Sequence, residues 1–395
     1  MTEKIFRCIE ARAEEHKQLL KDIVCMDTYT PDKADVDAMG RYLCDFAEKQ
    51  GFHVQVHPFE KAGDGLLITM NEDAPLPPVV FTGHLDTVHP KGTFETLWRE
   101  EDGNWYGPGV SDMKGGLVVG LLAMCALKDA GYRDRPIKFI MISDEELSEG
   151  LTGEEGKDFI RNNARGAAAA ITLEAGNGKK ITVGRKGSIR YKVYVTGKAS
   201  HAGSAYSKGI SAIKEASHKI LAIEAPSDQE QITYNCGMIK GGTSPNTVPE
   251  KVEFTLYNRY WKMAQRQEIK DHVEGIIAKS YIPGTVSTFD VVGERLPMEA
   301  TEQNYALAAH LADVSEKYGF GKREPVLTSS GSDASYTTMA GAPSVCSMGP
   351  VGGQIHSVRE FMRGDSLVSS SKLIAAAIVE LPAVFGTEQW EYFGR

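Results

Sequence analysis

The first half of the chain carries two hydrophobic patterns, one typical of helices and one typical of strands. Apolar residues in the first fifty positions recur every three or four residues with charges between them, as on an amphipathic helix. This spacing predicts a helical start, with a helix over 33–50 that ends at Gly51. Short apolar runs predict strands at 52–56, 66–70, 79–88, 137–142 and 167–173, and a long run rich in alanine and leucine predicts a buried helix at 115–130.

Strands that alternate with helices predict a largely parallel sheet with helices on both faces, a three-layer α/β/α arrangement. After Gly184 the pattern changes, because residues 188–195 alternate between apolar and polar, as in a sheet with one wet face. The elements expected next have a β-α-β-β-α-β order, which suits a small two-layer α+β domain of the ferredoxin-like kind. They are a helix at 209–223, strands at 231–239 and 251–260, a helix at 263–279 and a strand at 285–292.

Helical patterns at 304–318 and 366–381 then resume the first kind of organisation. We therefore expect an α/β fold in which a larger domain, made of residues 1–185 and 295–395, is interrupted by an inserted domain at 186–294. The 395 residues, 42% hydrophobic and 25% charged, are enough for two or three domains that each bury a core.

Charge and cysteine usage narrow the class of protein. The net charge of −9 argues against a general binder of nucleic acids or anionic membranes, which usually shows a basic face. The six cysteines are scattered without a C-x-x-C pair, which predicts buried free thiols in a reducing compartment. No apolar signal segment opens the chain, and no apolar run is long enough to span a bilayer. We expect a soluble, cytoplasmic protein with neither a nucleic-acid nor a membrane partner.

Candidate chemistry starts at the sequence GHLDT, residues 83–87, which closes one of the predicted strands. Alternate side chains of a strand share a face, so His84 and Asp86 are expected to point together from its carboxyl end. Ligands of open α/β sheets collect at that edge. The pair is therefore a candidate for the start of a metal site, provided that further ligands exist elsewhere in the chain.

Acidic residues follow other predicted elements in the same way. Asp112 lies in a glycine-rich turn before the helix at 115–130, where capping the helix is the commoner role of an aspartate. Three acids, Glu145 and Glu146 among them, follow the strand at 137–142. Their mutual repulsion needs a cation or a proton to relieve it, unless they form a solvated acidic turn.

Two more candidates complete the pattern, since Glu174 follows the strand at 167–173 and His356 lies in a glycine-rich loop. Each of these residues taken singly is more often structural. Taken together they supply the five or so protein ligands with which two zinc-type ions that share a carboxylate are held. Glu145, next to a ligand, is then available as general base for a water. The predicted ligands are His84, Asp112, Glu146, Glu174 and His356.

These motifs, in this order and over nearly the whole chain, resemble those of the co-catalytic zinc metallopeptidases of the aminoacylase and glutamate carboxypeptidase type. The resemblance implies two Zn²⁺ per subunit, with Co²⁺ or Mn²⁺ as substitutes. It also implies that Asp86 orients His84, that Glu145 is the general base, and that a cis peptide bond follows Asp112. The implied ligands are His84 and Glu174 for one ion, Glu146 and His356 for the other, and Asp112 as the bridge.

Two segments of the predicted insertion match further motifs of this family. Residues 198–203 resemble its lid segment, whose histidine reaches the active site of a neighbouring subunit, and residues 241–249 resemble a loop whose asparagine contacts substrate. The resemblance implies that His201 stabilises an oxyanion, that Asn246 holds substrate, and that the inserted domain is a lid through which a homodimer forms. For either residue an ordinary hydrogen bond within its loop is the alternative.

Arg259 resembles the arginine that grips a substrate carboxylate, and a cation on the surface of a sheet is its alternative role. The chain departs from the family here, because Tyr257 stands where an aspartate is often found. The loop at 330–334 resembles a family segment near the substrate, which adds Ser332 to the expected substrate contacts.

The resemblance implies hydrolysis of an amide or peptide bond next to a free carboxylate, in a small peptide or an N-acyl amino acid. Judged from residues 197–213, glutamate carboxypeptidases are the most similar, and N-acyl amino acid deacylases, desuccinylases and dipeptidases are the alternatives. A relative that has lost catalysis and serves as a metal-binding scaffold is an alternative of another class, against which the presence of Glu145 speaks. The sequence has neither the G-x-S-x-G turn of serine hydrolases nor the G-x-G-x-x-G of dinucleotide-binding oxidoreductases.

Overall fold

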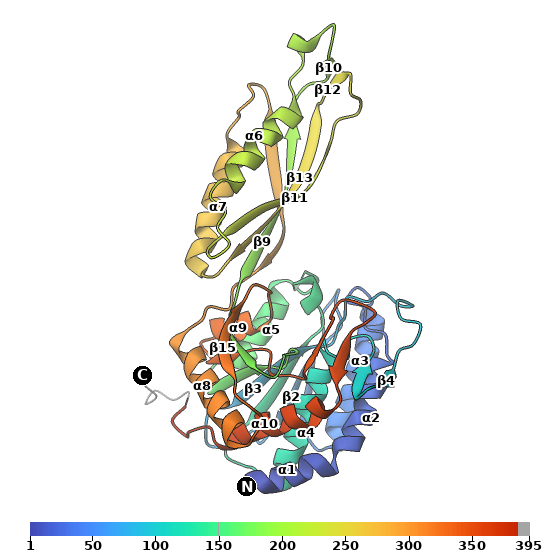
Figure 1. Cartoon of the computed structure of the whole chain (residues 1–395), viewed down its shortest axis with the longest axis vertical. Helices are drawn as coiled ribbons and strands as arrows, with labels where there is room; N and C mark the ends of the chain where they lie inside the picture. Colours follow the sequence, from blue (N-terminus) through green and yellow to red (C-terminus); the bar gives the residue numbers. More distant parts are fainter. Residues whose placement is uncertain (149, 386–395) are drawn as a thin grey trace. The chain divides into compact units, whose positions relative to one another are not determined.

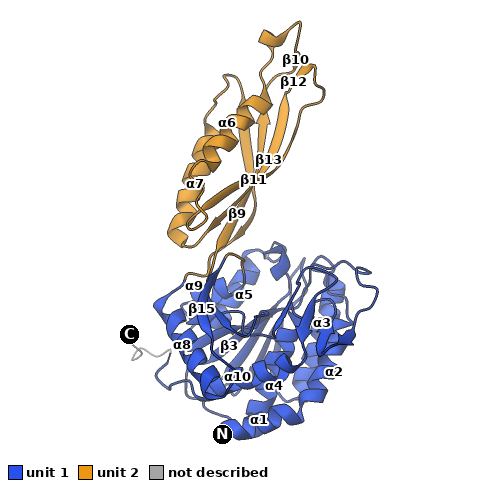
Figure 2. Cartoon of the chain, viewed as in Figure 1, with its two compact units in different colours: residues 1–184, 300–328, 332–395 blue, residues 185–299, 329–331 orange. Residues whose placement is uncertain are grey.

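The computed structural model describes residues 1–148 and 150–385, which form two compact units (Figure 2). Unit 1 contains Met1–Gly184, Ala300–Thr328 and the described residues from Ser332 onward. Unit 2 contains Arg185–Glu299 together with Ser329–Gly331. Unit 2 thus ends at Glu299 rather than at residue 294, and it includes a short segment of the returning chain.

Unit 1 is built around a six-stranded sheet. In spatial order its strands are β1 (His53–His57), β2 (Gly65–Met70), β6 (Ile137–Ile142), β3 (Val79–His84), β7 (Ala169–Thr172) and β16 (Ser344–Val345). The strands from β6 to β16 run parallel, whereas β2 is antiparallel to β6 and β1 is antiparallel to β2. The sheet is therefore largely parallel, as predicted, with an antiparallel pair at one edge.

Helices cover both faces of this sheet (Figure 1). One face carries α1 (Thr2–Ala11), α2 (Ala13–Val24), α3 (Lys33–Lys49), α4 (Lys114–Ala130), α8 (Glu302–Lys317) and α10 (Asp365–Val379), whose apolar side chains join one core. Two helices, α5 (Glu154–Ala164) and α9 (Ala334–Met339), contact β6 and β7 respectively from the other face. The central strands β2, β6, β3 and β7 are almost entirely buried in this three-layer arrangement.

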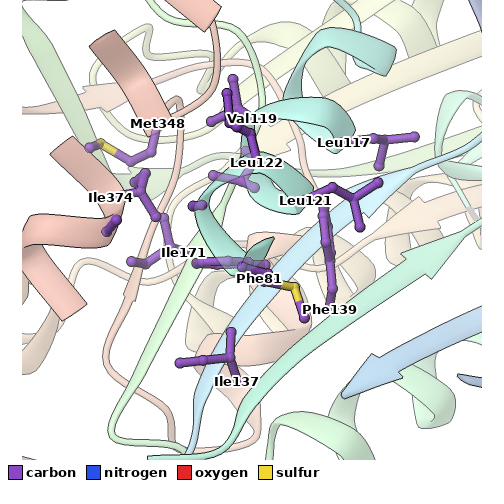
Figure 3. Close-up of a cluster of buried hydrophobic side chains, with 14 of the residues drawn as sticks. Phe81, Leu117, Val119, Leu121, Leu122, Ile137, Phe139, Ile171, Met348 and Ile374 are labelled. Atoms are coloured by element: carbon purple, nitrogen blue, oxygen red, sulfur yellow. The ribbon is translucent and has the colours of Figure 1, made fainter. Parts of the chain in front are cut away.

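The core is centred on α4, in which every residue except Lys128 and Asp129 is buried. Figure 3 shows Phe81 and Phe139 from neighbouring strands beside apolar side chains of this helix. Their rings meet edge to face with centroids 5.6 Å apart. Each fully buried side chain of this size stabilises the fold by roughly 1.5–3 kcal/mol relative to its exposed state. The apolar run at 115–130 forms the buried helix that its composition predicts.

Unit 2 is a two-layer α+β structure. Its four-stranded antiparallel sheet has the order β11 (Thr233–Gly241), β13 (Lys251–Tyr260), β9 (Gly187–Thr196) and β14 (Val286–Arg295). Two helices, α6 (Ala212–Glu224) and α7 (Met263–Ala278), pack on one face over a separate apolar core. Its first and third strands are central, which is the ferredoxin-like order. The short strands β10 (Ser200–His201) and β12 (Thr247–Val248) pair at one end of this unit (Figure 1).

Several short elements have no counterpart among the predicted ones. A small sheet contains β17 (Gly352–Gly353), β18 (Phe361–Arg363), β5 (Asn104–Tyr106) and β4 (Arg99–Glu101) in that order, and β8 (Lys180–Arg185) pairs with β15 (Glu324–Thr328). Two 3₁₀ helices, η1 (Glu145–Leu147) and η2 (Tyr206–Lys208), complete the described elements. Most of these strands have two or three residues, too few for a period to be visible in the sequence.

Two expectations need correction. The strand expected at 79–88 ends at His84, so Asp86 lies beyond it. All six cysteines are unpaired, but only Cys44, Cys125 and Cys346 are buried, and the prediction of a buried thiol is wrong for the exposed Cys25. Within residues 1–148 and 150–385, no helix is both long and apolar enough to cross a membrane.

Candidate metal centre

Three neighbouring parallel strands of unit 1 end at the same edge of the sheet. His84 is the last residue of β3 and lies opposite Ile142, the last residue of β6. Glu145 and Glu146 begin η1, shortly after β6, and Glu174 follows β7 by two residues. Because parallel strands present their carboxyl ends together, the register brings one imidazole and three carboxylates to one edge.

Asp112 reaches this edge from the turn that precedes α4. Gly116, in the first turn of α4, lies against the main-chain carbonyl of Leu173, and a Cβ at this glycine would collide with that oxygen. The missing side chain therefore lets the start of α4 approach the end of β7, which brings Asp112 close to Glu174. The peptide bond between Asp112 and Met113 is cis, as the resemblance implies.

His356 lies in the loop between β17 and β18 with a backbone φ of +59°. A positive φ is uncommon for any residue other than glycine. The loop is braced by the Ser357 hydroxyl, which donates to the carbonyl of Gln354 at 2.7 Å, and by the main-chain N–H of Glu360, which donates to the carbonyl of Ser357 at 3.0 Å. His356 is half-exposed, whereas His84 is fully buried.

Two groups of three candidate ligands share Asp112. His84 Nε2 lies 3.2 Å from Oδ1 of Asp112, and His356 Nε2 lies 3.3 Å from Oδ2 of the same carboxylate. His356 Nε2 is also 3.2 Å from Glu146 Oε2. Within each group the donor atoms all lie within 4.8 Å of one another. The groups are His84, Asp112 and Glu174, and Asp112, Glu146 and His356.

Asp86 is fully buried beside the first of these groups. Nδ1 of His84 lies 3.0 Å from the main-chain carbonyl oxygen of Asp86 and 3.3 Å from its Oδ1. The carboxylate of Asp86 also accepts hydrogen bonds from the Thr30 hydroxyl at 2.8 Å and from the main-chain N–H groups of Glu145 and Glu146 at 3.3 and 3.2 Å. With Nδ1 of His84 held on this side, Nε2 is the ring nitrogen that faces Asp112. A carboxylate behind a histidine in this way fixes the tautomer and orientation of the ring.

The electrostatics of the cluster favour positive charge at its centre. Burial alone would lower the pKa of His84, but hydrogen bonds with Asp112 and Asp86 raise it well above its ordinary value. Hydrogen bonds with Asp112 and Glu146 raise the pKa of His356 to about 10, and burial raises the pKa of Glu146 to about 7. Protons thus hold together carboxylates that would otherwise repel one another.

Each of the two groups has residues that could hold a divalent cation. Oε1 of Glu146 is buried and has no hydrogen-bond partner among the described residues, so one oxygen of a candidate ligand is left unsatisfied. Imidazole nitrogens and carboxylate oxygens are the donors that Zn²⁺ and similar divalent ions take. Because the two oxygens of Asp112 face different histidines, this residue has the geometry of a bridging ligand.

Glu145 lies next to the cluster but belongs to neither group of ligands. It is 8% exposed, and its main-chain N–H donates to Asp86, which fixes where its side chain starts. Its charge is close enough to Glu146 to add, after burial, to the raised pKa of that residue.

Ser332 lies at the edge of the same cluster in unit 1. Its hydroxyl is buried and lies 3.5 Å from Oε1 of Glu174, at the outer limit of a hydrogen bond. The structure therefore brings it to a candidate ligand.

Sequence reasoning missed Glu360. Its carboxylate is fully buried and accepts hydrogen bonds from the main-chain N–H groups of Gly109, Ser111 and Asp112. The one signal in the sequence is its place four residues after His356. Three main-chain partners of this kind leave no trace in a sequence pattern.

The two candidate substrate residues at the β10–β12 end of unit 2 lie together. Ala202, next to His201, donates its main-chain N–H to the carbonyl of Asn246 at 2.8 Å. His201 is exposed, and its Nδ1 accepts from the main-chain N–H groups of Gly203 and Ser204, both at 3.1 Å, which leaves the ring proton on Nε2. His201 is thus prepared to donate a hydrogen bond from Nε2.

Arg259 lies near the other end of β13 and donates to the hydroxyl of Tyr257 at 2.7 Å. From Lys251, where β13 begins next to the β10–β12 pair, to Arg259 the strand covers roughly 26 Å. Within unit 2, Arg259 therefore lies far along β13 from the end that carries His201 and Asn246.

Comparison with known proteins agrees with this arrangement. Residues 80–380 match the pattern of peptidase family M20/M25/M40. The chain is 27% identical to carboxypeptidase G2 of Pseudomonas sp. (strain RS-16), covering 92% of this chain and 88% of that protein. It is 26% identical to the succinyl-diaminopimelate desuccinylase of Gluconacetobacter diazotrophicus, covering 92% of this chain and 96% of that protein.

Solved structures share the fold. The aminopeptidase PepT of Bacillus cereus superimposes with a TM-score of 0.74 at 24% identity, over 93% of this chain and 98% of that one. The metallo-carboxypeptidase Sso-CP2 of Sulfolobus solfataricus gives a TM-score of 0.71 at 15% identity, over 94% and 99% of the two chains. With a family pattern that spans most of the chain, the chain belongs to peptidase family M20/M25/M40 and is a hydrolase that acts on C–N bonds.

Proposed function

We propose that unit 1 is a catalytic domain that holds two divalent cations and hydrolyses an amide or peptide bond next to a free carboxylate. The observation that carries this proposal is the position of Asp112, whose Oδ1 and Oδ2 lie 3.2 and 3.3 Å from two different histidines. We take the ions to be Zn²⁺, for which Co²⁺ or Mn²⁺ can substitute. One ion is held by His84, Asp112 and Glu174, and the other by Asp112, Glu146 and His356.

The residues have separate tasks in this proposal. Asp86 holds Nδ1 of His84 and so directs Nε2 toward the ions. When bound, the cations supply Lewis acidity that polarises a substrate carbonyl and acidifies a water. Glu145 accepts a proton from the attacking water on its carboxylate and then passes it to the leaving nitrogen. Ser332 is proposed as a substrate contact, supported by the 3.5 Å distance between its hydroxyl and Oε1 of Glu174.

We propose a small peptide or an N-acyl amino acid as substrate, held through its carboxylate by Arg259. Support comes from the similarity to carboxypeptidase G2 and from the arginine's contact with a neutral hydroxyl, which leaves its charge for an anion. Desuccinylation is the second candidate, favoured by the similarity to a desuccinylase over 92% of the chain. Deacylase and dipeptidase activities are variants of the same chemistry.

We also propose that unit 2 serves as a lid and as the dimerisation domain of a homodimer. The roughly 26 Å of β13 between the His201 end and Arg259 favours a division in which the two ends of one unit 2 serve different active sites. His201 would then donate from Nε2 to the oxyanion of a partner subunit's substrate, with Asn246 beside it. The six unpaired cysteines support a reducing, cytoplasmic location.

The test is hydrolysis of a panel of dipeptides and N-acyl amino acids, including succinylated ones, with free and amidated carboxyl groups and with the bound metal quantified. We expect turnover of free carboxylates only, loss on chelation, and recovery with Zn²⁺. Equal turnover of amidated substrates would refute the role of the carboxylate, and activity that withstands complete metal removal would refute the metal centre.

A further inference from the structure

Glu360 connects the two loops that present Asp112 and His356. It lies just before β18, in the segment that carries His356, and its side chain is fully buried. Oε1 accepts from the main-chain N–H groups of Ser111 and Asp112 at 2.8 and 2.9 Å, and Oε2 accepts from that of Gly109 at 3.1 Å. One carboxylate therefore satisfies three donors of the turn that ends in the bridging aspartate.

A buried turn of this kind needs such an acceptor. Main-chain N–H groups that lose water without a partner each cost about 1–3 kcal/mol, and hydrogen bonds to a carboxylate are about twice as strong as neutral ones. The negative charge is accommodated by its surroundings, since His89 Nε2 lies 3.4 Å from Oε2 and the buried Lys114 contributes an attractive interaction. The side chain of Glu360 is thus held on several sides while it holds the turn.

We propose that Glu360 is a positioning residue for the metal centre: it fixes the main chain at Asp112 and thereby the direction of the bridging carboxylate. The hydrogen bond reaches Asp112 itself, at the N–H one bond from the Cα that carries the ligand side chain. The main-chain N–H of Glu360 donates to Ser357, next to His356, so the same residue couples the bridge to a ligand of the second group. This inference rests on the proposed two-metal centre.

Glutamine at this position isolates the effect. In Glu360→Gln the side-chain oxygen can still accept from Ser111 and Asp112, but the amide N–H₂ meets the N–H of Gly109, donor against donor, and the charge is lost. Glu360→Asp keeps the charge on a shorter side chain. A matched control is Glu215→Gln in unit 2, since Glu215 is fully buried and accepts from the main-chain N–H groups of Tyr281 and Ile282 at 3.1 and 2.6 Å, remote in sequence from every candidate ligand.

The experiment measures Zn²⁺ and Co²⁺ affinity by competition with a chelator, together with the visible spectrum of the Co²⁺ protein and the Tm of the metal-free protein. We expect Glu360→Gln to bind metal about 10–100-fold more weakly than the wild type, as for other residues that orient ligands, and to change the Co²⁺ spectrum. The metal affinity of Glu360→Asp should lie between those of the wild type and Glu360→Gln. Glu215→Gln should lower Tm with unchanged metal affinity and spectrum.

Unchanged metal affinity and an unchanged Co²⁺ spectrum in Glu360→Gln would overturn the inference and leave Glu360 a purely structural residue. If Glu360→Gln does not fold, the same measurements are made on Glu360→Asp. Weaker metal affinity in that variant supports the inference, and unchanged affinity overturns it. A wild-type protein that binds two metals without hydrolysing the panel would refute the proposed reaction while leaving this inference open to the same measurement. A wild-type protein that binds no metal would refute both.

Discussion

The carboxylate of Asp86 lies 3.3 Å from Nδ1 of His84 and at the same time accepts the main-chain N–H groups of Glu145 and Glu146. One buried side chain therefore links a candidate ligand on β3 with the candidate base and a second ligand that follow β6. Asp86 therefore contacts the ring of His84 and at the same time holds the main chain at the start of η1.

The first prediction concerns this link. Asp86→Asn removes the charge behind His84 and places N–H groups either at Oδ2, which now accepts from Thr30 and Glu146, or at Oδ1, which now accepts from Glu145. We expect metal affinity to fall about 10–100-fold, with a larger loss of turnover, because the ligand and the base both shift. Chelator competition and steady-state kinetics check this. Asp37→Asn, which alters an aspartate that accepts the N–H of Asp64 at 2.7 Å, is the control, and an equal loss of affinity in both variants would contradict the prediction.

The strand ends explain how much of the site could be predicted. His84, Glu146 and Glu174 follow apolar runs whose period is visible in the sequence, and parallel strands bring such positions to one edge. We expected His84 and Asp86 to share a face as alternate residues of one strand. This expectation was wrong in part, because β3 ends at His84 and Asp86 lies beyond the end of the strand. Its partners Thr30, Glu145 and Glu146 come from distant segments, and the sequence pattern shows nothing of these contacts.

Other features could not be predicted because they depend on main-chain contacts between distant segments. Glu360 binds three N–H groups that lie about 250 residues earlier in the chain, a distance over which local patterns carry no information. The strands β17 and β18, which frame His356, have two and three residues, so no alternation marks them. The ferredoxin-like order of unit 2 was predictable, because its strands are long and one of their faces is wet.

The second prediction tests the base. Glu145→Gln keeps the size of the side chain and its main-chain bond to Asp86 but removes the proton acceptor. We expect turnover to fall about 10²–10⁴-fold with two metals still bound, as is usual when a general base is lost. Metal analysis and initial rates measure the two effects separately. Glu155→Gln, on the exposed surface of α5, should leave both unchanged, and full activity of Glu145→Gln would exclude this residue as the base.

The third prediction asks whether His201 acts across subunits. His201→Ala removes the Nε2 donor and should lower kcat about 10²–10³-fold with normal metal content, as for loss of an oxyanion donor. Mixing equal amounts of this variant and Glu145→Gln should restore about a quarter of the wild-type activity, because random exchange makes half of all dimers mixed and each mixed dimer carries one complete site of two. Activity is measured after subunit exchange, with each variant alone as control. If exchange occurs and no activity returns, His201 acts within its own chain or not at all.

The last prediction concerns a histidine outside the site. His16 is fully buried, its Nδ1 lies 2.9 Å from the carbonyl of Arg12, and its Nε2 has no hydrogen-bond partner among the described residues. Burial lowers the pKa of His16 below its ordinary value of 6.5. As the pH falls, the imidazole in the unfolded chain takes up a proton near that ordinary value, whereas in the folded protein it does so only at a lower pH. The contribution of the neutral ring to the free energy of unfolding is therefore complete above about pH 6.5. It is lost as the pH falls from there toward the pKa of His16 in the folded protein.

We accordingly expect the free energy of unfolding of the metal-free protein to decrease between about pH 7.5 and about pH 5.5, and to decrease less steeply in His16→Leu. Urea unfolding at a series of pH values measures both slopes. His53→Leu is the matched control, since His53 is an exposed histidine that lies 2.7 Å from Glu72. Chelator is present throughout, so that metal release contributes nothing to the slopes. If the free energy of unfolding changes with pH as steeply in His16→Leu as in the wild type, the buried imidazole does not contribute to acid sensitivity. The titratable groups of the metal centre would then be tested next.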